Sequence, residues 1–131
     1  MILDSSAVVA ILRAEPEALI MAKAMSLGEV RGISAVSYLE AAIVIDSGRD
    51  PIASRRFDDF FREADIVIEP VTFNQAKIAR DAYRDFGKGR HRAGLNFGDC
   101  FAYAFAKEKG ESLLFKGDDF RHTDIESPGI E

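Results

Sequence analysis

Acidic side chains at four separated places are the residues of this chain that could act together chemically. They are Asp4, Glu40, Asp99 and the adjacent pair Asp118 and Asp119. Carboxylate oxygens are the ligands that hard cations such as Mg²⁺ and Mn²⁺ prefer. Clustered carboxylates that hold one or two such ions can activate water and stabilise the leaving oxygen of a phosphodiester. If the fold brings these acids together, the predicted chemistry is metal-dependent phosphodiester hydrolysis.

Most of these acids also have a simpler structural explanation. Asp4 can cap the N-terminus of the helix that follows it. Asp99 falls in the first turn of a predicted helix, where the helix dipole favours an acid, although Asn96 can already serve as the cap. Residues 118–119 can form a solvated turn. Each position alone is therefore weak evidence, and it is their joint occurrence that indicates a site.

Glu40 is the acid that a surface role explains least well. It lies four residues after Val36 and three before Ile43, a spacing that places it on the apolar stripe of its own helix. A carboxylate that faces a core is costly unless it is paired or bound to a cation. The alternative to a metal site is an interior salt bridge, for example to an arginine.

Other common sites are excluded by the residues present. A zinc site is not expected, because zinc usually takes several cysteine or histidine ligands and the chain has only Cys100, His91 and His122. Gly87-Lys88-Gly89 does not continue into a dinucleotide-binding fingerprint, and the chain has neither a phosphate-binding P-loop nor a G-x-S-x-G elbow. A phosphoaspartate phosphatase would want a second acid where this chain has Ser6.

The charge balance at first argues against nucleic acid as a partner. The net charge is −5 and the isoelectric point about 5.1, whereas nucleic-acid-binding domains usually carry a basic surface. Cations bound by the acids would reverse the local field. A local basic cluster, formed by Lys88, Arg90, His91 and Arg92, lies in a loop bounded by glycines and is a candidate for contact with a phosphate backbone.

The length and the order of predicted elements indicate one α/β domain over residues 1–131. Strands are expected near residues 1–3, 30–33, 66–68 and 113–115, with a last short strand at 123–125. Helices are expected near 6–13, 17–27, 34–46, from 51 onward, 72–86 and 96–109. Such alternation predicts a sandwich around a mostly parallel sheet, and ligands bind such sheets beyond the carboxyl ends of the strands. No targeting segment or membrane span is visible, so a cytoplasmic protein is expected.

Four segments of the chain resemble the motifs of VapC toxins, the PIN-domain ribonucleases of type II toxin–antitoxin (VapBC) pairs. They are Met1-Ile2-Leu3-Asp4-Ser5-Ser6-Ala7, Ser37-Tyr38-Leu39-Glu40, Asn96-Phe97-Gly98-Asp99-Cys100 and Leu114-Phe115-Lys116-Gly117-Asp118-Asp119-Phe120. The resemblance covers essentially the whole chain, in the right order and with ordinary spacing.

The resemblance implies a PIN-like three-layer α/β/α sandwich and Mg²⁺-dependent (or Mn²⁺-dependent) endonucleolytic cleavage of RNA, often transfer RNA. It also implies a homodimer and a small VapB-like antitoxin whose tail covers the site, where a basic side chain is expected to enter. By match, Asp4, Glu40 and Asp99 hold the metal and Ser6 supports Asp4. The fourth acid is Asp118 or Asp119, and Asp119 is preferred because Phe120 beside it can anchor the turn.

Two other functions remain compatible with the residues. One is a PIN-like module that binds RNA or an antitoxin without cleaving. The other is a metal-dependent phosphatase that acts on a small substrate. A metal-dependent nuclease assay with an Asp4→Asn control separates these alternatives.

Overall fold

A computed structural model describes residues 1–28 and 30–128 of the chain. Residues 29 and 129–131, which belong to the expected domain, lie outside the described part. The elements, in chain order, are β1 (Ile2–Leu3), α1 (Ser5–Leu12), α2 (Ala18–Ser26), β2 (Arg31–Ser34), α3 (Ala35–Asp46), α4 (Pro51–Glu63), β3 (Ile66–Glu69), α5 (Phe73–Phe86), α6 (Phe97–Lys109), β4 (Leu113–Leu114) and the 3₁₀ helix η1 (Asp119–His122).

The sheet has the strand order β3-β2-β1-β4, and every neighbouring pair is parallel. Leu3 pairs with Ile33 on one side and with Leu114 on the other. The short strand β1 is therefore central, and its carboxyl end leads directly to Asp4, whose backbone N–H donates to Leu114 O at 2.9 Å. Because the strands are parallel, their carboxyl ends meet at one edge of the sheet.

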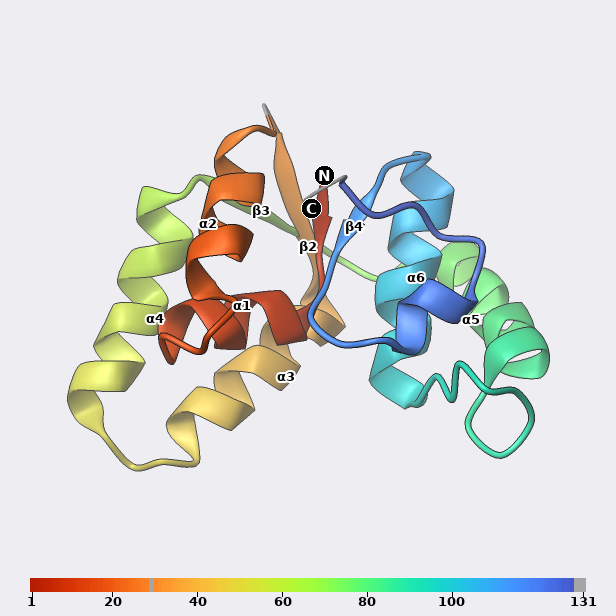
Figure 1. Ribbon diagram of the computed structural model, residues 1–131, viewed down its shortest axis with the longest axis horizontal. Helices are drawn as coiled ribbons and strands as arrows, with labels where there is room; N and C mark the ends of the chain where they lie inside the picture. Colours follow the sequence, from red (N-terminus) through yellow and green to blue (C-terminus); the bar gives the residue numbers. More distant parts are fainter. Residues whose placement is uncertain (29, 129–131) are drawn as a thin grey trace.

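Helices cover both faces of the sheet, with α1 to α4 on one side and α5 and α6 on the other (Figure 1). The alternation of side chains along β1 explains the two cores. Leu3 packs with Ile33 and Leu114 beneath α1 to α4, whereas Ile2 packs with Phe105 of α6. The chain is thus an α/β sandwich around a parallel sheet, as the sequence predicts.

Most expected elements are present within about two residues of their predicted bounds, but the last strand is not. Residues 123–125 form a turn after η1, in which Thr123 Oγ1 accepts from Ile125 N at 3.2 Å. Asp124 is held by the side chains of Tyr103 and Lys107 of α6. A backbone hydrogen bond of 2.8 Å, from Leu113 N to Glu126 O, joins the residues that follow this segment to β4. The hydrogen bonds of the Thr123 and Asp124 side chains thus take the place of the short strand that the sequence predicts at residues 123–125.

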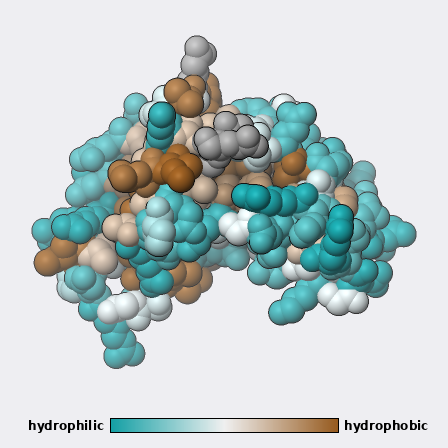
Figure 2. Space-filling model, viewed as in Figure 1, coloured by the Kyte–Doolittle hydropathy of each residue, from teal (hydrophilic) through white to brown (hydrophobic). Residues whose placement is uncertain are grey.

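Figure 2 shows a largely hydrophilic surface on this face of the molecule, with hydrophobic patches where α2 lies. Leu19 and Leu27 of this region are 85% and 73% exposed. In the described part of the chain, no helix is both long and apolar enough to cross a membrane.

Candidate active site at the carboxyl ends of the strands

Asp4 is the most buried acid of the site, with 3% of its surface exposed. It follows β1 and caps the N-terminus of α1, so the capping role predicted as its structural explanation is confirmed. Its Oδ2 accepts hydrogen bonds from Ser6 N at 3.0 Å and Ser6 Oγ at 2.6 Å. Burial raises the pKa of Asp4, while the bonds from Ser6 oppose that shift. Its Oδ1 is also buried and has no hydrogen-bond partner among the described residues, so capping alone does not account for this carboxylate.

Glu40 projects from α3 toward the first turn of α6. A side chain at Gly98 would collide with the Glu40 carboxylate, so this close approach depends on glycine. Burial, together with the charges of Asp4 and Asp99, raises the pKa of Glu40 to about 7. Among the described residues no salt bridge holds Glu40. The interior ion pair that could have explained this residue is therefore absent from that part of the chain.

The prediction that Glu40 and Ile43 share a core-facing stripe of α3 was wrong, because Ile43 is 58% exposed. The buried face of α3 is instead formed by Ser37, Ala41 and Ile45. Because two small residues line this face, α3 packs closely on the sheet with its larger apolar side chains partly outward. Glu40 lies at the boundary between the two faces.

Asp99 both caps its helix and faces the other acids. Asn96 and Asp99 form a capping box, in which Asp99 Oδ2 accepts from Asn96 N at 3.1 Å and Asp99 N donates to Asn96 Oδ1 at 2.8 Å. The pKa of Asp99 is raised to about 6, mainly by burial and further by the charges of Asp4 and Asp119, although the hydrogen bond from Asn96 N opposes this rise. Ala102 and Ala106, on the same face of α6, are fully buried.

The geometry distinguishes between the two acids of the Asp118-Asp119 pair. The charge of Asp119 raises the pKa of both Asp4 and Asp99. Asp118 makes no such contribution, and its carboxylate lies 3.6 Å from Arg121 Nε on the surface. Both side chains are exposed, but Asp119, the first residue of η1, is the one close to the other acids. Buried Phe120 anchors η1 against Phe115, as expected.

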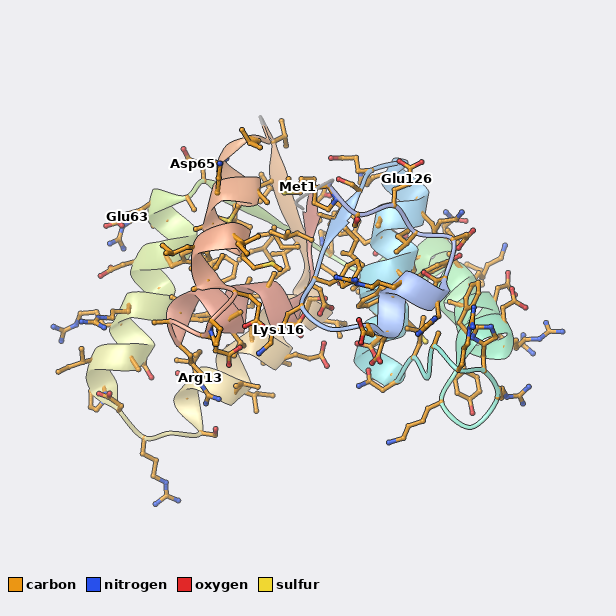
Figure 3. The ribbon with its side chains drawn as sticks, viewed as in Figure 1. Met1, Arg13, Glu63, Asp65, Lys116 and Glu126 are labelled. Atoms are coloured by element: carbon orange, nitrogen blue, oxygen red, sulfur yellow. The ribbon has the colours of Figure 1, made fainter. Side chains whose placement is uncertain are left out.

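Ser6 links Asp4 to the loop that follows β4. Its Oγ donates to Asp4 and accepts from Lys116 N at 3.0 Å. The Lys116 ammonium, which points from this loop toward the segment after α1 (Figure 3), pairs with Glu15 at 2.7 Å and Glu17 at 3.6 Å. Lys116, Glu15 and Gly98 were not among the predicted site residues. The available signals were the position of Gly98 in the third motif and that of Lys116 in the fourth.

The basic loop lies apart from the acids. Lys88, Arg90 and Arg92 are all exposed, in a turn closed by hydrogen bonds from Lys88 N to Leu95 O and from Leu95 N to Phe86 O, each 2.9 Å. Its last cation, Arg92, precedes Asp99 by seven residues in the chain. Its cations do not neutralise the carboxylates in the described structure.

The donor set suits a hard divalent cation. It consists of carboxylates from four elements, with one buried oxygen, Asp4 Oδ1, left without a partner. In residues 1–28 and 30–128, no three acidic, histidine or cysteine side chains stand close enough together to hold an ion as they are. Binding would therefore have to draw the acids closer, and the ion would offset both the burial and the mutual repulsion that raise their pKa values.

Comparisons with known proteins identify what the whole chain is similar to. The family model for the PIN domain matches residues 1–126. The chain is 54% identical over 127 residues to ribonuclease VapC28 of Mycobacterium tuberculosis, covering 96% of each chain. It is 50% identical over 125 residues to ribonuclease VapC of Mycolicibacterium smegmatis, covering 95% of this chain and 97% of the relative.

A solved structure shares the fold. The Mycobacterium tuberculosis toxin VapC20, described as cleaving the sarcin–ricin loop, superposes with a TM-score of 0.76 over 95% of both chains at 16% identity. At that identity the likeness bears on the fold alone. The family match over nearly the whole chain and the relatives at about half identity show that the chain belongs to the VapC ribonucleases of the PIN-domain family.

Proposed function

We propose that this chain is the toxin of a toxin–antitoxin pair and an endoribonuclease that depends on Mg²⁺ or Mn²⁺. The observation that carries this proposal is that acids from separate elements act on one another. Besides their burial, the charges of Asp4 and Asp99 raise the pKa of Glu40, and the charge of Asp119 raises the pKa of both Asp4 and Asp99. Acids from four elements that repel one another are costly without a cation. The names of the relatives, ribonucleases, support RNA as the substrate.

Asp4, Glu40 and Asp99 would hold the metal, with Asp119 assisting. The ion, when bound, lowers the pKa of water and stabilises negative charge on the phosphodiester. The protein's own contribution is orientation. Ser6 fixes one oxygen of Asp4 through two hydrogen bonds, which leaves the other oxygen free toward the site. Because burial and the neighbouring acids raise the pKa of Glu40 to about 7, about half of the metal-free protein carries a proton on this carboxylate near pH 7, and metal binding should release it.

The deciding experiment measures cleavage of single-stranded and transfer RNA by the pure protein. We expect hydrolysis with Mg²⁺ or Mn²⁺, none in EDTA, and none from Asp4→Asn at the same concentration. Cleavage that persists in excess chelator would overturn the metal-dependent proposal. RNA binding without cleavage would identify a binding module, and release of phosphate from a small phosphomonoester instead of RNA cleavage would identify a phosphatase.

An antitoxin that presents a basic side chain to the site is the proposed protein partner. The guanidinium of arginine matches carboxylate geometry in a bidentate way, so an acidic pocket is a natural receptor for it. The inserted cation would compete with metal for the same oxygens. Expression of the chain alone should arrest growth, and co-expression of the adjacent gene should rescue it. Harmless soluble expression of the wild-type chain would contradict the toxin proposal.

We also propose that the chain forms a homodimer. Leu39 and Ile43 on α3 are 57% and 58% exposed. These large apolar side chains support a dimer interface on this face, beside the site. Light scattering of the pure protein tests this proposal. Dimeric mass for the wild type and monomeric mass for Leu39→Glu are expected, with Leu19→Glu on α2 as the matched control. A monomeric wild type at micromolar concentration would refute it.

A further inference from the structure

The helix α5 and the loop after it carry charge of the opposite sign to the rest of the chain. Residues 77–92 contain six of the 17 lysines and arginines but only two carboxylates, although the whole chain has a net charge of −5. All six cations are exposed: Lys77, Arg80, Arg84, Lys88, Arg90 and Arg92. A strongly basic surface on an acidic protein indicates a polyanionic partner at this place.

Beside these cations lies an apolar groove between α5 and α6, the two helices on one side of the sheet (Figure 1). Its volume is about 320 Å³, and its lining residues are Ala76, Ala79, Arg80, Tyr83, Phe97, Cys100 and Phe101. Phe97 is 77% exposed and Tyr83 is 43% exposed. Three aromatic rings thus surround a hollow with small residues and one arginine, which suits a flat apolar group carrying negative charge next to it.

The groove and the basic loop are physically connected. The Arg90 guanidinium lies over the Tyr83 ring, 5.2 Å from its centroid. Gly87, which begins the loop, packs so tightly on Tyr83 that a side chain there would collide with the ring and with Tyr83 O. The ring of Phe86 meets His91 edge-on at 5.3 Å. The loop cations are therefore placed by the same helix that forms one wall of the groove.

The groove also flanks the acids. Phe97 and Asp99 lie in the same first turn of α6, and Gly98 between them faces Glu40 of α3. Residues two positions apart project from nearly opposite sides of a helix, so the Phe97 ring and the Asp99 carboxylate lie about one helix diameter apart, roughly 10 Å. A nucleic-acid strand that passes the acids can reach the groove within a few nucleotides.

We infer that the groove binds one unpaired base of the RNA strand, a few nucleotides from the phosphate that is cleaved, while Arg80 and the loop cations contact the backbone. This inference rests on the proposed ribonuclease function. Bases stack on aromatic side chains with little sequence preference, because every base has a π-face. A purely apolar protein partner would fill the groove but would leave the surrounding cations without a counterpart.

The test compares two aromatic substitutions by the kinetics of cleavage of a short single-stranded RNA. Tyr83→Leu removes the stacking ring but keeps an apolar wall, and Phe73→Leu is the control, because Phe73 is exposed on the same helix outside the groove. We expect Tyr83→Leu to raise KM about 5- to 100-fold, the range that corresponds to the loss of one stacked base. Its kcat should stay within about twofold, and Phe73→Leu should match the wild type.

A series of RNAs with a single abasic position, moved along the strand, locates the base. Binding is measured with the Asp4→Asn protein, so that the RNA is not cut. One position should weaken binding about 5- to 100-fold, and the same abasic RNA should cost nothing further when Tyr83→Leu is also present. Arg80→Gln should lower the slope of log affinity against log salt by about 0.7, as expected for one phosphate contact on a single strand.

The outcomes separate this inference from the function on which it rests. Absence of RNA cleavage by the wild type would overturn the proposed function. Normal cleavage by the wild type with an unchanged KM for Tyr83→Leu would overturn the groove inference and leave the ribonuclease standing. A change in oligomeric mass for Tyr83→Leu without a change in RNA affinity would show that the groove is a protein interface, and the inference would also be wrong.

Discussion

The Glu40 carboxylate lies against the backbone of Gly98, in the space that any side chain at position 98 would occupy. This contact joins the middle of α3 to the first turn of α6 and sets the distance between two of the acids. The colliding atoms are the far end of a flexible side chain, so a larger residue at position 98 would displace Glu40 more readily than it would disrupt the helices.

Gly98→Ala should therefore damage activity more than folding. Alanine is the better helix former by about 1 kcal/mol, which offsets part of the cost of moving Glu40. We expect RNA cleavage to fall by at least about tenfold, because small displacements of catalytic groups are costly, while the melting temperature stays within a few degrees. Gly48→Ala, where a side chain would meet only ordinary contacts, is the matched control. Wild-type turnover by Gly98→Ala would show that the position of Glu40 does not matter.

The raised pKa of Glu40 predicts how the metal-free protein responds to pH. The pKa rises from 4.5 to about 7 on folding, so the folded state binds the proton more tightly than the unfolded state. Stability must then fall as pH rises from about 4.5 to 7 and level off above that range. Glu40→Gln lacks this titration. Because the side chain is half-exposed, solvent screens part of the effect.

Thermal unfolding in EDTA at several pH values measures that difference. Glu40→Gln and the wild type should melt together near pH 4.5, and the variant should melt a few degrees higher at pH 8, since about 1 kcal/mol corresponds to about 4 °C in a domain of this size. Asp58→Asn, on the exposed face of α4, is the control. A variant that melts well below the wild type at pH 8 would indicate that Glu40 stabilises the fold.

The paired acids after β4 should differ in their effects. Asp119→Asn removes a charge that acts on Asp4 and Asp99, so we expect turnover to fall by about tenfold or more. Asp118→Asn breaks only a surface ion pair with Arg121, which is worth little, and its turnover should stay within about twofold. Metal affinity, measured by Mn²⁺ titration, should change in the same order. Equal effects of the two substitutions would remove the distinction between them.

The elements and the positions of the acids could be predicted because they depend on local patterns. Apolar runs predict the strands, and caps such as Thr72 and Asn96 begin their helices as expected. Asp4 and Asp119 follow predicted strands, so parallel strand ends bring them to one edge.

What could not be predicted depends on contacts between distant elements. The approach of Glu40 to Gly98 requires α3 and α6 to pack side by side, and nothing in either segment fixes that packing. The pairing of Lys116 with Glu15 joins residues about a hundred positions apart. Ile43 is exposed because α3 buries the side that carries Ser37 and Ala41. These small side chains allow a closer approach than the apolar stripe that contains Ile43.

We propose that Asp4 both caps α1 and binds the catalytic metal ion. Asp4→Asn is the sharpest substitution, because the asparagine oxygen can still accept the capping hydrogen bonds from Ser6, whereas the negative charge is lost. Turnover on RNA and thermal unfolding in EDTA are measured on the same preparation of this variant. We predict that turnover falls by at least about a thousandfold while the melting temperature is unchanged or higher, since an uncompensated buried charge is removed. Turnover within about tenfold of the wild type, or loss of the folded state with the cap preserved, would contradict the account.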